Sequence, residues 1–177
     1  MKHISIITIL LLILSSSSNC KKGGLFGDKL PPATQEGKNT CGFLLNGQVW
    51  LPKGDNGYPN LICDYDETYN GGSFNIGGYR YGTEGRSAFS VSGRNITSPG
   101  TYKLNLTSSH RTYFSIDNPQ NYCVYYWEDT TINHNAYLSI TKLDKTNRII
   151  SGTFEFAQVK QGCQEVRITQ GRFDMKY

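Results

Sequence analysis

The sequence predicts an all-β domain, an antiparallel β-sandwich or flattened β-barrel of about 8–10 strands, after an N-terminal signal peptide and a flexible tether. Three observations carry this prediction. The chain has 12 tyrosines and 19 glycines, a composition typical of strands joined by tight turns. From residue 41 onward, short alternating runs are broken by Gly, Asn, Asp and Pro. None of these runs keeps a helical period over three turns.

The first 20 residues have the pattern of an export signal. A basic start is followed by Ile4–Leu14, an apolar run of 11 residues, and then by small polar residues. This run is too short to cross a bilayer, which needs ~20 apolar residues. The segment resembles the lipobox of bacterial lipoproteins, in which a cysteine receives a diacylglycerol before cleavage. We therefore expect a signal peptide over 1–19 and a lipid on Cys20.

The resemblance departs from the usual lipobox at two positions. Ser17 stands where the pattern has an aliphatic residue, and Asn19 stands where it has Gly, Ala or Ser. The alternative is an ordinary secreted protein whose Cys20 is free or disulfide-bonded. Lipidation predicts a chain anchored to the bilayer of the cell envelope, in the outer membrane. In some lipoproteins of Bacteroidetes, acidic residues just after the cysteine direct the protein to the cell surface. Lysines follow Cys20 here, so the resemblance to lipoproteins does not imply surface display.

Residues 20–40 are rich in Gly, Pro, Lys and Thr and show no periodicity, which predicts a flexible tether. The all-β domain is expected over 41–177. Its strands follow from period-two alternation bounded by turn residues. They are expected at 42–51, 59–66, 72–81, 86–93, 100–106, 111–117, 122–128, 136–143, 148–158 and 165–176.

The last strand changes phase within its length. Val166 and Ile168 fall on even numbers, whereas Phe173 and Met175 fall on odd numbers. Because side chains alternate with period two, the change requires an extra residue in the strand. The sequence predicts a β-bulge at Gly171, where glycine accepts a left-handed conformation.

Four cysteines remain in the domain, and an even number in an oxidising compartment predicts two disulfides. They are Cys41, Cys63, Cys123 and Cys163. Their wide spacing, without a CxxC pair or a histidine cluster, does not favour a metal site.

The pairing of the cysteines depends on strand register. A hairpin of 42–51 and 59–66 would separate Cys41 from Cys63 by roughly 20 Å, which disfavours Cys41–Cys63 and with it the complement Cys123–Cys163. Two pairings stay open: Cys41–Cys163 with Cys63–Cys123, and Cys41–Cys123 with Cys63–Cys163. The first is preferred because it ties the ends of the domain together.

Catalytic signals are weak, and we expect neither enzymatic activity nor a cofactor. His110 and His134 lie in polar turn sequences typical of solvated histidines. Asp64 and Asp66 share one strand face, a pattern more typical of a solvated face than of paired catalytic carboxylates. The sequence contains no GxSxG elbow and no HExxH motif.

Aromatic residues crowd two neighbouring strands. Tyr125 and Trp127 share one face, and Tyr113 lies on the strand before them. An exposed aromatic face would suit a glycan or peptide ligand, so these three residues are the candidate binding site. The alternative is packing on both faces of the strand inside a sandwich.

The domain opens with Cys41-Gly42-Phe43-Leu44-Leu45-Asn46-Gly47-Gln48-Val49-Trp50 and closes with the segments 149–156 and 168–174. The opening and the close resemble those of small, uncharacterised lipoprotein domains of Bacteroidetes. The resemblance implies an all-β fold and a lipid anchor, and it implies no activity.

These observations favour a non-enzymatic binding or structural module of the cell envelope. The net charge of +4 is scattered, so nucleic acid is not an expected partner. Two alternatives stay open: a small hydrolase or enzyme inhibitor with an unrecognised site, and an eight-stranded outer-membrane barrel.

Overall fold

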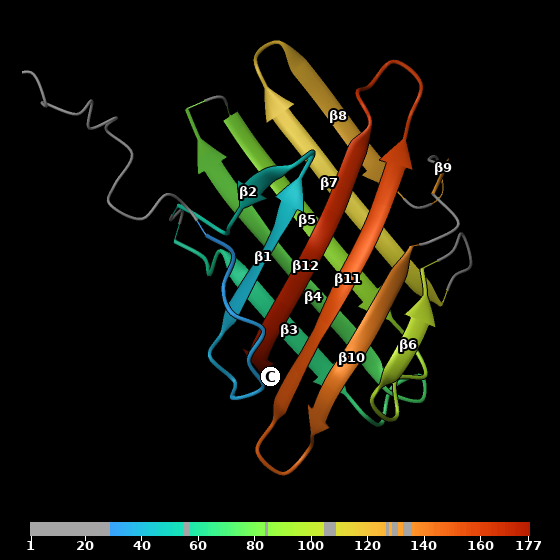
Figure 1. Cartoon of the computed structure of the whole chain (residues 1–177). Coiled ribbons are helices and arrows are strands. Elements are labelled where there is room, and N and C mark those ends of the chain that lie inside the picture. The colour runs from blue at the N-terminus through green and yellow to red at the C-terminus, as the bar shows by residue number, and fades with distance from the viewer. Residues whose placement is uncertain are drawn as a thin grey trace, which may run out of the picture.

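The computed structural model describes residues 29–54, 57–83, 85–104, 109–126, 128, 131–132 and 136–177. These residues form two antiparallel sheets that pack face to face, with no helix in the described segments (Figure 1). The domain is therefore a β-sandwich, not one sheet closed into a flattened barrel. The eight-stranded membrane barrel is wrong for the same reason, since it needs a single closed sheet. The described segments also contain no helix long and apolar enough to span a membrane.

The first sheet has the order β2-β1-β12-β11-β10-β6, and short β9 pairs with β11 outside this path. Its strands are β1 (Thr40–Leu45), β2 (Gln48–Trp50), β6 (Gly100–Lys103), β9 (Thr131–Ile132), β10 (Tyr137–Asp144), β11 (Ile149–Val159) and β12 (Val166–Lys176).

The second sheet has the order β3-β4-β5-β7-β8 and lies behind the first in Figure 1. Its strands are β3 (Leu61–Asp66), β4 (Ser73–Gly82), β5 (Gly85–Gly93), β7 (His110–Asn118) and β8 (Asn121–Tyr126). All ten predicted strands overlap strands of the structure, because alternation in the sequence follows which face is buried.

The predicted strand over 42–51 is in fact two strands. β1 and β2 are joined by a turn at Asn46 and Gly47, whose φ angles of 48° and 84° suit a type I′ hairpin. The predicted hairpin of 42–51 with 59–66 is wrong, because β1 pairs with β12 whereas β3 pairs with β4 in the other sheet. The register argument about the cysteines fails with that hairpin.

Aromatic rings from both sheets meet in the core. Phe74 of β4 stacks on Phe173 of β12 with ring centroids 5.3 Å apart. Phe89 of β5 stacks on Phe154 of β11 at 5.9 Å. All four rings are almost completely buried, so they join the sheets through the large apolar area that they remove from water.

The predicted bulge in the last strand is confirmed, but its left-handed residue is Gln170. Phe154 pairs with Gly171 and Phe156 with Ile168, so β12 contains one extra residue there. Gln170 has a φ of 52°. Gly171 is needed for another reason: a Cβ at this position would lie 2.5 Å from the carbonyl oxygen of Phe154.

Replacement of Gly171 by alanine should therefore lower the free energy of unfolding by about 2–4 kcal/mol, since backbone must move to admit the methyl group. Replacement of Gln170 by glycine is the matched control and should leave stability unchanged or slightly higher, because glycine accepts a positive φ. Urea denaturation measures both. Equal stability of the Gly171 variant and the parent would show that the close approach is not present in solution.

The last part of the predicted tether is bound to the sandwich through Asp174, whose side chain is only 1% exposed. Its carboxylate accepts hydrogen bonds from the Thr34 hydroxyl at 2.6 Å and the Gly37 amide at 2.7 Å. The amides of Glu36 and Lys38 donate to it at 3.0 and 3.3 Å. The Ser151 hydroxyl of β11 donates from the sheet at 2.8 Å. Residues 34–38 are thus attached to β12.

Candidate functional site

A cavity of about 450 Å³ opens at one end of the sandwich. It lies where β2, the β4–β5 hairpin, the end of β7 and the β11–β12 loop come together. The volume falls within the range of small-molecule sites in proteins. The described residues that line it are Leu45, Gln48, Val49, Trp50, Arg80, Gly82, Thr83, Gly85, Arg86, Ser87, Ile116, Asn118 and Gln164.

One row of side chains crosses the inner face of the second sheet at this end. Arg80 pairs with Ser87, Ser87 with Ile116, and Ile116 with Cys123. Alternation places all four on the same side as the buried Phe89, because residues two apart on a strand share a face. The first three line the cavity.

Trp50 borders the cavity from the opposite sheet. Its ring is 3% exposed and stacks on Phe43 with ring centroids 4.6 Å apart. The indole N–H donates a hydrogen bond to the Ser87 hydroxyl at 2.8 Å, which joins β2 to β5. The tight turn at Asn46–Gly47 sends β2 back over this end of the sheet and so brings Trp50 to the cavity.

Polar side chains outnumber apolar ones in the lining. Arg80 is half-buried, and one of its guanidinium nitrogens donates to the Leu51 carbonyl oxygen at 3.4 Å. Gln48, Asn118 and Gln164 add carboxamides, each of which can both donate and accept. None of the described lining residues is acidic; Glu84, in the β4–β5 turn, lies outside the described residues.

A second arginine at this end, Arg86, contacts aromatic rings on the outer face of the second sheet. The Arg86 guanidinium lies over the rings of Tyr79 and Tyr81, 5.6 and 5.9 Å from their centroids. These distances are typical of cation–π contacts. Arg86 therefore braces the end of the β4–β5 hairpin on the side away from the core, while Arg80 is the inward-facing cation.

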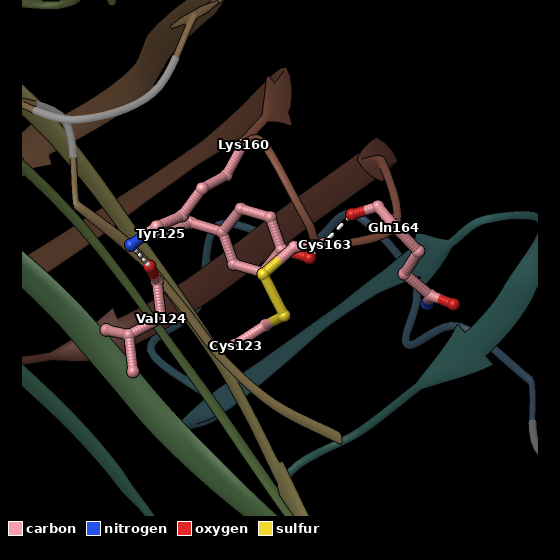
Figure 2. Close-up of a disulfide and its surroundings, with 6 residues drawn as sticks. All are labelled: Cys123, Val124, Tyr125, Lys160, Cys163 and Gln164. Atoms are coloured by element: carbon pink, nitrogen blue, oxygen red, sulfur yellow. Dashed lines mark hydrogen bonds between the residues drawn. A yellow bond between two sulfur atoms is a disulfide. The ribbon is translucent and has the colours of Figure 1, made fainter. Parts of the chain in front are cut away.

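A disulfide fixes the loop that contributes Gln164 to the cavity. Cys123 of β8 is bonded to Cys163 in the β11–β12 loop, with Cα atoms 6.0 Å apart (Figure 2). The same loop is held by the Tyr125 hydroxyl, which donates to the Gln164 carbonyl at 2.5 Å, and by the Lys160 ammonium, which donates to the Val124 carbonyl at 2.6 Å. These bonds connect the two sheets and position Gln164 beside the cavity.

This disulfide corrects the predicted pairing. The preferred combination of Cys41–Cys163 with Cys63–Cys123 is wrong, and so is the other combination left open, because Cys123 is bonded to Cys163. Cys41 and Cys63 are free thiols in the structure. The cause is the hairpin that the sequence argument assumed and the fold does not contain.

The structure does not bring the predicted aromatic site together. Tyr125 is fully buried with Cys123 in the core. Tyr113 is half-buried on the opposite face, next to Tyr126 at 5.4 Å between ring centroids. Trp127 lies outside the described residues, as does Cys20. Tyr122 and Tyr126 are the exposed aromatics of β8, at 72% and 51%.

The weak catalytic candidates have local structural roles. Asp66 accepts hydrogen bonds from the Thr68 amide and hydroxyl at 2.8 and 2.7 Å, which caps a turn. These bonds hold the pKa of Asp66 below its usual value. His110 begins β7 and is half-buried, not in a solvated loop, and burial lowers its pKa. His134 lies outside the described residues.

Sequence reasoning did not find the cavity. Its residues come from β1, β2, β4, β5, β7, the β4–β5 turn and a loop near residue 164, and they share no motif in the chain. The one local signal was the Asn46-Gly47 pair, a strong hairpin turn, which would have placed Trp50 opposite Phe43.

Comparison with known proteins adds a family. A family model described as a domain of unknown function, DUF6252, matches residues 64–175, which is more than half of the chain. No curated protein matches, and no solved structure matches.

Proposed function

Since the chain belongs to this family of unknown function, DUF6252, we propose that it is a lipid-anchored envelope lipoprotein whose β-sandwich is a non-enzymatic, glycan-binding module. The cavity at the Trp50–Arg80 end is the observation that carries the binding role. The signal-like segment before Cys20, and the resemblance to Bacteroidetes lipoprotein domains, support the anchor.

The chemistry of the lining favours a hydroxyl-rich ligand. Seven of the lining residues have polar side chains and four have apolar ones, a ratio unlike that of a lipid site. A guanidinium and carboxamides together offer donors and acceptors in planar pairs, which suit neighbouring sugar hydroxyls. A peptide would instead use an exposed strand edge or an apolar groove.

Links between the two sheets brace the walls of the cavity, which supports a preformed binding site. The disulfide, the Trp50–Ser87 hydrogen bond and the Tyr125–Gln164 hydrogen bond each tie an element of one sheet to the other sheet. A preformed site loses less conformational entropy when it takes up a ligand. Ser87 lies at the centre of the row of side chains from Arg80 to Cys123. Its hydroxyl oxygen already accepts a hydrogen bond from the Trp50 indole N–H.

The binding role is tested with the non-lipidated full-length Cys20→Ser protein on an array of bacterial and host oligosaccharides. We expect selective binding to a glycan subset. The affinity for the strongest array oligosaccharide is then measured by tryptophan fluorescence in a Trp127→Phe background. Trp50 is then the sole tryptophan of the chain, which has two. Its emission should shift on binding because the indole borders the cavity.

Replacement of Arg80 by alanine should weaken this binding at least about tenfold, which corresponds to loss of one hydrogen bond to a charged group. Arg172→Ala is the matched control, because Arg172 lies on β12 and its side chain contacts Gln170. The control should bind like the parent. A protein that binds no glycan, or one that binds peptides instead, would contradict the proposal.

A further inference from the structure

Two of the four cysteines of the domain lie outside the disulfide, and both face the core. Cys41 of β1 is 3% exposed, and Cys63 of β3 is half-buried against the same core cluster. Both are free thiols in the structure. Because β1 and β3 belong to different sheets, the two thiols face the core of the sandwich from opposite sides.

Strand register places Cys41 and Cys63 at corresponding positions along the two facing sheets. Cys41 pairs with Phe173, whose ring stacks across the sheets on Phe74. Phe74 pairs with Tyr65, which is two residues from Cys63 on the same face of β3. The position beside Phe173 in one sheet therefore lies over the part of β3 that carries Cys63 in the other.

A hollow at the edge of the sandwich formed by β1 and β3 independently places Cys41 near the start of β3. It measures about 310 Å³ and is lined by Cys41 of β1 together with Asn60 and Leu61 at the start of β3. Leu61 is two residues from Cys63 and shares its inward face. Electrostatics agrees: burial is the main cause of the raised pKa of Cys41, and the charge of a Cys63 thiolate raises that pKa further.

β1 and β3 lie where the two sheets can move toward each other. β3 is the outermost strand of its sheet, and β2 pairs only with Phe43–Leu45. Among the described residues, no strand therefore covers the outer side of β1 at Cys41. Packed sheets lie ~10 Å apart, whereas a disulfide requires Cα atoms within ~7 Å. An edge strand without an outer neighbour can move inward by this difference more easily than a central strand.

We propose that Cys41 and Cys63 are oxidised to a second disulfide when the chain folds in the envelope, so that the two sheets are covalently joined at this edge. The inference rests on the export proposed above. The oxidant is a disulfide carried by a thiol–disulfide oxidoreductase. One cysteine thiolate attacks a sulfur of that disulfide and releases a thiolate. The other then attacks the mixed disulfide and releases the second.

The exchange transfers two electrons from Cys41 and Cys63 to the disulfide of the oxidoreductase, which becomes two thiols. The two protons lost by Cys41 and Cys63 pass to the two thiolates that are released. The attacking species must be a thiolate. Burial, with a smaller contribution from the neighbouring Asp64 carboxylate, raises the pKa of Cys63 to about 12. Bond formation therefore belongs to the stage before the sheets close over the thiols.

Trypsin separates all four cysteines, which makes the bond directly measurable. Cleavage after Lys and Arg leaves them in peptides 39–53, 54–80, 112–142 and 161–167. Full-length protein isolated from the envelope is denatured in iodoacetamide, digested without reductant and mapped by mass spectrometry. We expect peptide 39–53 linked to 54–80, peptide 112–142 linked to 161–167, and no alkylated cysteine among the four.

The outcomes distinguish this proposal from export itself. Linked 112–142 and 161–167 with alkylated Cys41 and Cys63 would overturn the second disulfide and leave export intact. Four alkylated cysteines would overturn both proposals. Linkage of Cys41 or Cys63 to Cys123 or Cys163 would overturn the pairing.

Two sets of variants complete the test. In a Cys123→Ala/Cys163→Ala protein the link between 39–53 and 54–80 should persist. In Cys63→Ala, which changes the less buried partner, Cys41 should become fully alkylated and Tm should fall by roughly 5–10 °C. An unchanged Tm, with Cys41 already alkylated in the parent, would contradict the proposal. Cys41→Ala provides the reciprocal measurement on Cys63.

Discussion

Replacement of Asp174 by alanine is expected to lower the free energy of unfolding by about 3 kcal/mol. The carboxylate accepts five hydrogen bonds, four from residues 34–38 and one from Ser151. Its removal leaves the buried Ser151 hydroxyl without this partner and releases the segment before β1. Loss of hydrogen bonds to a buried charged group has an effect of this size.

The same interaction predicts a dependence of stability on pH. Burial raises the pKa of Asp174, but the hydrogen bonds from Thr34, Glu36, Gly37 and Ser151 together lower it to about 2. A folded-state pKa below the unfolded value stabilises the protein above about pH 4. This stabilisation, on the order of 2–3 kcal/mol, is lost as the pH falls from about 4 to about 2.

Urea denaturation at pH 7 and at pH 2.5 measures both effects. The difference in stability between parent and variant should be large at pH 7 and should shrink at pH 2.5. Asp66→Asn is the matched control, because Asp66 is an exposed carboxylate that also accepts hydrogen bonds within a turn. A difference between parent and Asp174→Ala that does not change with pH would show that the carboxylate is not charged in the folded state.

Replacement of Cys20 by serine is expected to move the protein from the membrane fraction to the soluble fraction. Each buried methylene of an acyl chain contributes ~0.8 kcal/mol to membrane binding, so two or more chains anchor a polar domain stably. Serine has no thiol for thioether formation, and the diacylglycerol cannot be attached. Fractionation followed by mass spectrometry of the mature N-terminal peptide measures both location and lipid.

Ser16→Ala is the control for this experiment, because it alters the same signal and keeps the cysteine. That variant should stay in the membrane fraction with its lipid. A parent protein without lipid on Cys20, or a Cys20→Ser protein that stays membrane-bound, would show that the anchor is not at this residue.

The strands were predictable because their signal is local. β11 carries Ile150, Phe154 and Phe156 on its inner face, and these residues alternate in the chain as they do in the sheet. The bulge in β12 was predictable for the same reason, since a change of phase shows directly in the sequence. Its left-handed residue was assigned to Gly171 from propensity, whereas the strand places Gln170 there.

Pairing between distant strands was not predictable from alternation. β1 is adjacent in sequence to β2 and β3, yet its long partner is β12, more than 120 residues away. A period of two says which residues face inward and does not say which strand lies opposite. The disulfide pairing therefore failed, since it depended on the partner of β1. The cavity was missed because Trp50, Arg80 and Gln164 meet only after both sheets are assembled.

The most direct test of the binding role is to map the ligand on the protein. Amide chemical shifts of the ¹⁵N-labelled Cys20→Ser protein are measured during titration with the strongest array oligosaccharide. The account predicts that the changes concentrate at Arg80, Ser87 and Ile116, with Gln164 on the facing loop. Changes concentrated at Tyr113 and Tyr126, on the outer face of the second sheet, would contradict it.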